Sequence, residues 1–292
     1  MIPNSQNLRN LYIGWKAAFM GALRGDSTAE WPRIATKSPS STAAEEYGFL
    51  DNWPKFRKWV GDRILKQLGA HDYTIKNEDY ESSITVPINA VKDDNLGMYS
   101  EIFASYGVAA AQWPDDMIFA LLLLGETENG YDKVPYFGNH TVGGAVVSNL
   151  DAGASTPWYL FDTKKSLKPL IYQEREAPTL VPKDKPDDDN VFYGKKLVYG
   201  AHARGAAGFG LWQLAHKAKV ALDKAGFEAA KTAMRERTND EGETLKIVPN
   251  LIVVPPSLEG AARDLFVAER DANGATNTLK GAVEILVSSN LV

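Results

Sequence analysis

One histidine of this chain, His140, has sequence neighbours that could make it a catalytic base. Asp132 precedes it and Ser148 follows it in a glycine-rich stretch, and Ser-His-Asp triads are recognised by geometry, not by order along the chain. No serine lies in the G-x-S-x-G turn that exposes the nucleophile of α/β-hydrolases. We therefore keep a hydrolase that uses His140 and Asp132 as a remote alternative and expect His140 to be a structural loop residue.

The stretch Tyr199–Gln213 combines four glycines with three large aromatic residues. A phosphate-binding loop needs the spacing G-x-G-x-x-G between a strand and a helix. Gly205, Gly208 and Gly210 have the reverse spacing and lead into residues 211–215, which are typical of a strand. We predict a long, kinked strand whose glycines allow bulges or a close approach of another backbone.

No pattern in the chain predicts a metal or cofactor site. The run Asp187–Asn190 lacks the glycine and the distal glutamate of a calcium loop. The histidines show neither the i, i+4 nor the H-E-x-x-H spacing of a metal-binding helix; they are His71, His140, His202 and His216. We predict no catalytic, cofactor-binding or metal-binding residue and no enzyme activity.

Composition limits the class of protein. The 292 residues are 44% hydrophobic and 24% charged, which is ordinary for one large or two modest globular domains. The net charge of −5 argues against a basic protein that coats nucleic acid. Cysteine is absent, which excludes disulfides and thiolate chemistry. The longest apolar run, Met117–Leu124, is shorter than the roughly 20 residues of a membrane span, and no signal peptide is visible, so we expect a cytoplasmic protein.

Residues 6–23 predict an amphipathic helix, with Ser5 as its cap and Gly25 at its end. A polar stretch at 36–44 follows the helix and has almost nothing to bury. The apolar face therefore has no obvious partner in its own subunit, and it packs either back on its own domain or on a neighbour. That face consists of Leu8, Leu11, Tyr12, Trp15, Phe19 and Leu23.

Residues 70–92 predict a β-hairpin with a polar turn at 76–79. Pro87 cannot donate a hydrogen bond and belongs on an edge strand. A hairpin of this kind is marginally stable alone and needs a surface to lie on. The alternating apolar residues are Tyr73 and Ile75 on one arm and Ile84, Val86 and Ile88 on the other.

A long helix follows from Tyr99 to Leu124, with capping residues expected at 93–95. Pro114 should kink or split it, because an interior proline costs roughly 3 kcal/mol. Beyond it we expect loops with short strands at 126–157, then a β-rich part, then alternating α and β elements with Ser257 as a helix cap. The β-rich part comprises Trp158–Asp162, Leu170–Arg175, Lys196–Arg204 and Phe209–Leu214, and the last part a helix around Phe227–Met234, strand Leu251–Val254, a helix from Leu258 and a strand around Val283–Val287.

Several short stretches, in order along almost the whole chain, resemble the Mu-like phage major head subunit family. Two departures concern loops only: Asn139-His140-Thr141 stands where the family usually has an acidic residue followed by His-Pro, and the loop between Val142 and Trp158 is short. The matching stretches are Trp59–Arg63, Asp93–Tyr99, Pro114-Asp115, Tyr131-Asp132, Lys168-Pro169, Gln173-x-Arg175, Tyr199–Gln213, Val253–Ala262 and Lys280-Gly281.

This resemblance implies an α+β protein with the Hong Kong 97-type capsid fold. It would be the major capsid protein of an icosahedral head, assembled from hexamers and pentamers around double-stranded DNA. The parts implied are an N-terminal arm at 1–45, an extended β-hairpin loop at 46–94, a peripheral domain with a spine helix at 95–218, and an axial domain at 219–292. A related nanocompartment or gene-transfer particle would use the same fold. A binding module that stays monomeric and an enzyme of unknown class are kept as competing hypotheses.

The same resemblance suggests where subunits touch each other. The arm helix and the hairpin would pack on a neighbouring subunit, and two arginines of the β-rich part would form ion pairs across the interface. The residues we predict at these contacts are Trp15, Phe19, Tyr73, Ile84, Val86, Arg175 and Arg204.

The implied partners are further copies of the chain, a portal, decoration proteins and non-specifically contacted DNA, with no membrane. The resemblance begins almost at Met1, which leaves no room for a long N-terminal scaffolding segment. We therefore expect a separate scaffolding protein, little or no cleavage of this chain, assembly in the host cytoplasm and a final location in the virion.

Overall fold

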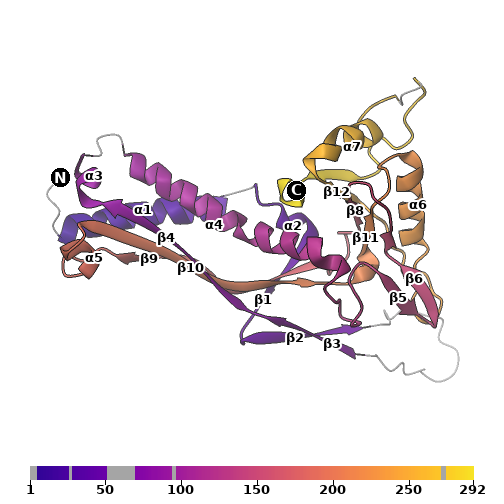
Figure 1. Cartoon of the computed structure of the whole chain (residues 1–292), viewed down its shortest axis with the longest axis horizontal. Coiled ribbons are helices and arrows are strands. Elements are labelled where there is room, and N and C mark those ends of the chain that lie inside the picture. Colours follow the sequence, from indigo (N-terminus) through magenta and orange to yellow (C-terminus); the bar gives the residue numbers. More distant parts are fainter. Residues whose placement is uncertain (1–4, 26–27, 51–69, 94–96, 271–273) are drawn as a thin grey trace.

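The computed structural model describes residues 5–25, 28–50, 70–93, 97–270 and 274–292. The chain forms a long body and a compact end (Figure 1). In the body, helices α1 (Ser5–Gly25) and α4 (Met98–Leu123) run along a four-stranded sheet. The compact end holds a five-stranded sheet flanked by α6 (Lys224–Arg235) and α7 (Glu259–Phe266).

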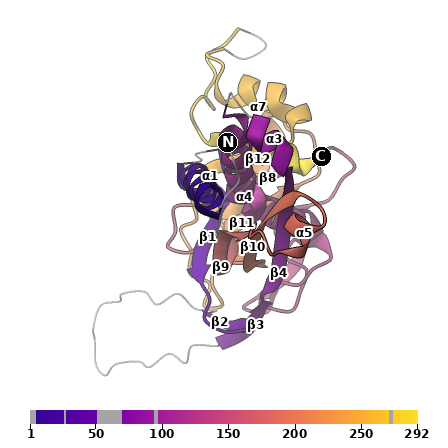
Figure 2. The same ribbon diagram turned by 90° about the vertical axis from the view of Figure 1, so that its left-hand side faces the viewer.

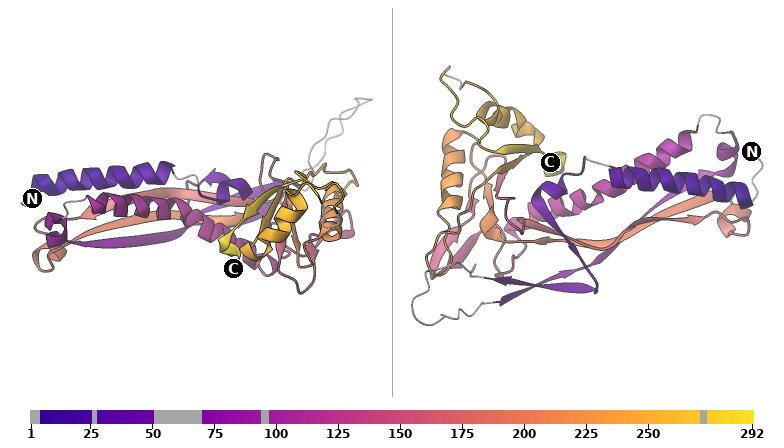
Figure 3. Two further views of the ribbon diagram at one scale, coloured as in Figure 1. Left: turned by 90° about the horizontal axis from the view of Figure 1, so that it is seen from above. Right: turned by 180° about the vertical axis from the view of Figure 1, so that it is seen from behind.

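The predicted amphipathic helix at 6–23 is confirmed as α1. Seen from above, α1 lies alongside α4 over the long strands (Figure 3). Its apolar face is buried there, with Leu8, Trp15 and Phe19 almost inaccessible to solvent. The arm helix therefore packs on its own subunit, the first of the two arrangements left open by its sequence.

Helix α4 runs without a break through Pro114, so of the predicted kink or split, the split is wrong. Proline removes one backbone hydrogen bond, but the residues that follow it, Ile118, Phe119 and Leu122, are fully buried in the core. Burying such side chains stabilises by roughly 1.5–3 kcal/mol each, which outweighs that cost. The N-cap is Gly97, with φ of +70°, and not a residue of 93–95.

The predicted hairpin at 70–92 is wrong in its pairing. Strand β3 (Ala70–Lys76) pairs with β2 (Ala44–Leu50) in a two-stranded ribbon. Strand β4 (Glu78–Pro87) instead joins β10 (Lys196–Phe209), antiparallel along its whole length. Alternating side chains identified both strands, but alternation does not say which strand is the partner.

The four-stranded sheet has the order β1-β9-β10-β4. Its other strands are β1 (Ala35–Pro39), parallel to β9, and β9 (Leu170–Lys183), antiparallel to β10. Strand β4 lies at the edge, as Pro87 predicted. Strand β4 and the short helix α3 (Ile88–Asp93) belong to the body, so among the described residues of the expected loop at 46–94 the part that extends from the body is the β2–β3 ribbon, which starts at Ala44.

The glycines of β10 act as their sequence predicted. The register between β9 and β10 shifts around Arg204, which is a bulge. A Cβ on Gly205 would lie 2.7 Å from the Gln173 carbonyl oxygen, and one on Gly208 would collide with Ile75 of β3. The predicted strand at 209–214 is wrong, because a 3-10 turn at Trp212–Leu214 leads into the short strand β11 (Ala215–Ala218).

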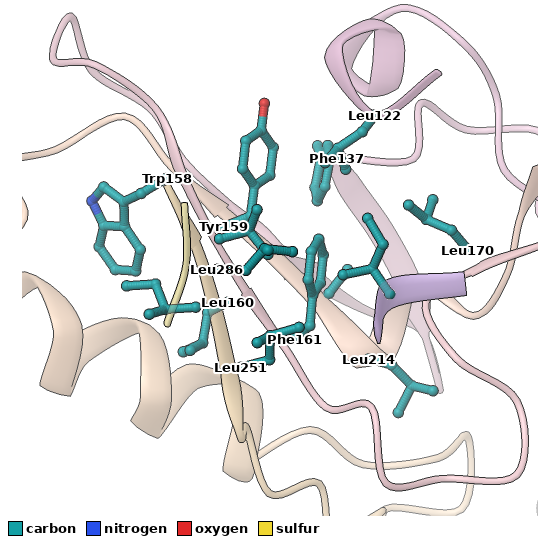
Figure 4. Packing of buried hydrophobic residues seen from close by; sticks show 14 of the residues in the cluster. Leu122, Phe137, Trp158, Tyr159, Leu160, Phe161, Leu170, Leu214, Leu251 and Leu286 are labelled. Atoms are coloured by element: carbon teal, nitrogen blue, oxygen red, sulfur yellow. The ribbon is translucent and has the colours of Figure 1, made fainter. Parts of the chain in front are cut away.

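The five-stranded sheet has the order β13-β12-β8-β11-β7. Three of its five strands lie before residue 219, on the peripheral side of the domain boundary expected at 218. That boundary therefore runs through this sheet and does not separate it from the body. Large side chains fill the space between the strands and helices (Figure 4), among them Trp158, Tyr159 and Phe161. The remaining strands are β7 (Leu150–Asp151), β8 (Trp158–Phe161), β12 (Leu251–Val254) and β13 (Glu284–Val287).

The connecting elements are short. Residues 126–157 contain loops and short strands, as predicted. The predicted cap Ser257 lies inside a 3-10 turn, and α7 starts after Leu258 without a side-chain cap. The elements not yet named are α2 (Trp31–Ile34), β5 (Asn139–Val142), β6 (Ala145–Ser148), α5 (Asp189–Phe192) and the 3-10 turns Leu124–Glu126 and Ser289–Leu291.

Length and composition alone would let residues 98–126 cross a membrane. Core helices of soluble proteins pass the same test, and in this chain α4 lies alongside α1 over the long strands.

The position of β4 predicts the effect of charge on its two faces. Val86 is 1% exposed and packs in the apolar cluster under α1 and α4, so Val86→Asp should lower the free energy of unfolding by about 3 kcal/mol or more. Thr85→Asp is the matched control, because Thr85 is exposed on the same strand and should cost about 1 kcal/mol or less. Urea unfolding of the isolated subunit measures both, and equal stability of the two variants would contradict this packing.

Candidate assembly surfaces

The arm residues predicted to contact a neighbour lie inside their own subunit. The Trp15 ring stacks on Phe103 of α4 at 4.8 Å between ring centroids and meets Tyr199 of β10 edge-on at 5.3 Å. Phe19 is fully buried beside Tyr106. Since Trp15 is only 4% exposed, neither side chain has surface left for a second subunit, and both are withdrawn as contacts.

Three residues of the supposed hairpin are also satisfied within the chain. The Tyr73 hydroxyl accepts a hydrogen bond from the Phe209 backbone N–H at 3.1 Å. Val86 is buried and Ile84 is half-buried in the cluster under α1 and α4. The apolar side chains of Ile84 and Val86 looked unpaired only because the pairing of β4 with β10 was not visible in the sequence.

The two predicted interface arginines have partners within the chain. The Arg204 Nε lies 3.1 Å from Asp79 Oδ1, an ion pair between the adjacent strands β10 and β4. Arg175 Nη1 donates to the Ser40 carbonyl at 3.2 Å, beyond the end of β1. Both contacts are intramolecular, and each uses one nitrogen of a guanidinium that carries five N–H donors, so the predicted ion pairs between subunits stay a prediction.

A different surface carries exposed aromatic side chains. Phe192 and Tyr193 are 70% and 81% exposed, and their rings touch edge-on at 4.9 Å between centroids. They lie at α5, in the turn between β9 and β10 at the far end of the body (Figures 1 and 2). The sequence signal for this surface is two adjacent large aromatics in a charged turn, which the predicted contacts do not include.

Buried polar side chains attach the ribbon and the arm segment to the body. The Gln173 amide, fully buried on β9, accepts from the Tyr47 hydroxyl at 2.9 Å and donates to Asn77 Oδ1 at 2.7 Å. The Asp115 carboxylate accepts the backbone N–H groups of Glu30 and Trp31. Burial raises the pKa of Asp115, although these two donors act in the opposite direction.

His140 and Asp132 do form a pair, with 2.5 Å between Nδ1 and Oδ2. The other ring nitrogen faces the Tyr136 carbonyl at 3.3 Å, and the ring stacks on Trp212 at 3.9 Å. Ser148 does not reach this pair, because its hydroxyl donates to the Leu150 carbonyl. The geometry therefore gives no support to a hydrolase and agrees with a structural histidine.

Arg237 organises a buried polar cluster beside Trp212. Its Nη1 donates to the carbonyls of Trp212, Gln213 and Ala215, and its guanidinium lies 5.6 Å from the Trp212 ring centre. Burial lowers the pKa of Arg237 to about 9, which leaves the group charged at neutral pH. Three carbonyl acceptors compensate part of the cost of burying that charge.

His216 connects this arginine to a carboxylate. Its Nδ1 lies 3.2 Å from Arg237 Nη2, and its Nε2 lies 2.9 Å from Asp151 Oδ2. A guanidinium can only donate, so Nδ1 accepts and the proton of the neutral ring is on Nε2. Burial lowers the pKa of His216, while Asp151 acts in the opposite direction.

No group of three or more histidine, aspartate or glutamate side chains is placed to hold a metal ion in the described part of the chain.

Comparison with known sequences identifies relatives along the whole chain. The family described as Mu-like prophage major head subunit gpT matches residues 8–291. The chain is 37% identical to the major capsid protein of Escherichia phage Mu over the full length of both proteins. It is 34% identical to the Mu-like prophage FluMu major head subunit of Haemophilus influenzae, with 90% of this chain and 89% of that protein covered.

Solved structures with a similar fold are capsid subunits. A chain of the bacteriophage JBD30 procapsid is 37% identical, with 99% of this chain and 100% of that chain covered and a TM-score of 0.88. A chain of the JBD30 capsid gives 27% identity, full coverage of both chains and a TM-score of 0.82. The JBD30 capsid decorated with minor capsid protein trimers gives 27% identity, 91% and 92% coverage and a TM-score of 0.79.

The neutral state of His216 predicts how stability depends on pH. Because its pKa is lower in the folded chain than the ordinary value of 6.5, the unfolded chain binds a proton first as the pH falls. This contribution to stability is present above pH 6.5 and is lost progressively below it. His216→Gln, which can keep both hydrogen bonds without titrating, should flatten the decline that begins as the pH falls below about 6.5.

Urea unfolding at a series of pH values measures this decline. His202→Gln is the matched control, because His202 is exposed on β10 and lies outside the cluster. An unchanged pH dependence in His216→Gln would show that the buried ring is not the group that titrates.

Proposed function

We infer that this chain, which belongs to the Mu-like prophage major head subunit gpT family, is the repeating subunit of an icosahedral phage head around double-stranded DNA. The observation that carries this conclusion is the end-to-end match of sequence and fold to capsid subunits, with a TM-score of 0.88 over 99% of the chain. The function is mechanical, since many identical copies close a shell and their interfaces perform the work. The fold class is the expected Hong Kong 97-type α+β capsid fold.

We propose that the subunits form hexamers and pentamers through the compact end. This axial part comprises β7, β8, β11, β12 and β13 with α6 and α7, and replaces the expected boundary at 218. The body with α1, α4 and the four-stranded sheet is the peripheral part. The β2–β3 ribbon is the extended loop, and it supports a clasp on a neighbour because its two strands pair with each other and not with either larger sheet among the described residues.

The proposed partners follow from a head that is filled with DNA. They are further copies of the chain, a scaffolding protein during assembly, a portal, and packaged DNA contacted non-specifically. Decoration is supported by a relative, the JBD30 capsid, which carries minor capsid protein trimers. Assembly would take place in the host cytoplasm and the product would be the virion.

Negative-stain electron microscopy of the purified chain tests the shell function directly. We expect closed shells or rings of five and six subunits as the concentration rises, with or without co-expressed head proteins. A chain that sediments as a monomer under all these conditions would contradict the proposal.

The aromatic pair at α5 predicts a contact between subunits at the far end of the body. Phe192→Ser combined with Tyr193→Ser should leave the melting temperature nearly unchanged, because both side chains are exposed. Shell yield should fall about tenfold or more, as expected when aromatic anchors of an interface are truncated. The matched control is Phe192→Tyr with Tyr193→Phe, which keeps the aromatic area. Normal shells from the serine variant, counted by microscopy after gradient sedimentation, would exclude this end as an interface.

A further inference from the structure

One long side of helix α1 is left uncovered by the other described elements (Figure 3). Exposed residues recur along it every three or four positions, as expected for one side of a helix. We call this surface the open face of α1. It includes Arg9, Ile13, Gly14, Ala17, Gly21 and Arg24.

The open face carries positive charge only. Helix α1 contains Arg9, Lys16 and Arg24 and no aspartate or glutamate, although the whole chain has a net charge of −5. The two arginines are exposed. Lys16 lies half-buried at the margin of the face, with its ammonium 5.6 Å from the Tyr12 ring centre. None of the three cations forms an ion pair with another described residue.

Other cations of the body have acidic partners. Lys37 Nζ lies 2.8 Å from Glu174 Oε1, between β1 and β9. Arg204 is paired with Asp79 between β10 and β4. Surface charges of both signs are usually interspersed in this way. The open face of α1 therefore differs from the rest of the body in presenting a field of one sign to a molecule outside the subunit.

The cations are spaced for a partner that is charged along its whole length. Arg9, Lys16 and Arg24 are seven and eight residues apart, so they follow one side of α1 at intervals of roughly 10–12 Å, about two helical turns each. Double-stranded DNA carries one negative charge per about 1.7 Å of its axis. Each cation therefore meets a phosphate whatever the base sequence, and contacts to phosphates position a protein without reading bases.

Two glycines of the open face are not required by the packing of the subunit. Gly14 and Gly21 lie in the interior of α1, where glycine destabilises a helix relative to alanine. A Cβ at either position would meet no atom of the described chain within 4 Å outside its own stretch of helix. With Ala17 they keep the face flat, so a rigid duplex can come close to the helix backbone while the longer cationic side chains reach its phosphates.

The open face lacks the apolar centre of a protein interface. Ile13, which is 56% exposed, is the one large hydrophobic side chain exposed on the described part of α1. Specific interfaces between proteins have a buried core of larger apolar area, whereas protein–DNA interfaces are more polar and more positively charged. The observations therefore favour a polyanionic duplex over a second protein chain.

We propose that the open face of α1 contacts the phosphate backbone of double-stranded DNA and points toward the interior of the head. The inference rests on the proposed function, because a shell filled with DNA places the duplex against one side of every subunit. It adds which surface of the subunit makes that contact. Each copy supplies a small, sequence-independent attraction, and the attractions add up because many copies act on one molecule of DNA.

The test titrates a DNA duplex into the unassembled subunit and follows binding by NMR. Helix α1 is about 30 Å long, so a duplex of about twelve base pairs spans it at about 3.4 Å per base pair. Three phosphate contacts predict that binding weakens about forty-fold between about 50 and 200 mM salt. Arg9→Gln, Lys16→Gln and Arg24→Gln combined should bind about tenfold more weakly or less at the lower salt concentration and lose most of the salt dependence. Wild-type binding by this variant, or no binding by the wild type, would overturn the proposal.

The matched control removes three cations from a helix of the compact end. Lys224→Gln, Lys231→Gln and Arg235→Gln combined make the same charge change on α6, which also carries Glu228. This control should bind the duplex as the wild type does. An equal loss of binding in the two triple variants would show that net charge alone attracts DNA, and would overturn the assignment to α1.

A second variant keeps the test valid if the α1 triple variant folds poorly. Gly14→Gln with Gly21→Gln keeps every cation and adds better helix formers, so the melting temperature should stay the same or rise. The new side chains hold the duplex away from the helix, and binding should fall about threefold or more because salt screens the more distant charges. Ala225→Gln with Ala229→Gln adds similar side chains at exposed positions of α6 and should change nothing. Equal binding by the two double variants would overturn the proposal.

An acidic polypeptide distinguishes DNA from an acidic protein as the partner. Poly-L-glutamate carries one charge per about 3.3 Å of extended chain, which is a lower charge density than that of the duplex. It should bind more weakly than DNA at the same concentration of charge. Equal or tighter binding of poly-L-glutamate would identify an acidic protein as the partner and overturn the proposal.

Electron microscopy separates this inference from the shell function. The α1 triple variant should still form shells or rings, because the open face is not a contact between copies. Loss of shells together with unchanged DNA binding would make the face an interface between subunits and overturn the proposal. Absence of shells from the wild type would instead contradict the shell function, while the DNA contact is decided by the titration alone.

Discussion

The continuity of helix α4 through Pro114 is the constraint on which the rest of this structure depends. The first half of the helix contributes Phe103 to the cluster under α1, and the second half contributes Ile118, Phe119 and Leu122 to the larger core of the compact end. A helix that broke at Pro114 would leave these two clusters without a common rigid element. Because packing on both sides of the proline exceeds the cost of the missing hydrogen bond, one continuous helix couples the body to the compact end.

Two segments leave the long body of two helices on four strands. They are the segment before α2 and the β2–β3 ribbon. Those segments are held by buried polar groups: Asp115 holds the segment before α2, and Gln173 holds the base of the ribbon. Such bonds depend on direction and position, whereas apolar contacts do not. Polar anchoring therefore sets where the arm segment and the ribbon leave the body, which is a property that a shell subunit needs to reproduce in every copy.

The sequence was sufficient for most elements and insufficient for their partners. Helical spacing identified α1 and α4, and alternation of apolar side chains identified β3, β4 and β13. The glycines of β10 predicted a bulge and a close approach of another part of the chain, and the structure confirms both. Pairing failed because a strand's pattern records which face is buried and not which strand lies beside it. The neighbours of β4 and β3 are set by residues more than a hundred positions away in β10 and by β2.

These pairing errors also explain why apolar residues predicted at contacts between subunits are covered by the subunit itself. An apolar stripe on an arm or a hairpin signals that something must cover it, and the covering surface here is the subunit itself, with Trp15 against Tyr199 and Val86 under the helices. Residues that mediate assembly must meet a different requirement, because the free subunit has to remain soluble before it meets a neighbour. A small exposed pair such as Phe192 with Tyr193 satisfies that requirement better than a large apolar stripe does. The strong hydrophobic periodicity of α1 and β4 therefore reports on the subunit's own core, and an interface between copies has to be sought among small exposed patches that leave the free subunit soluble.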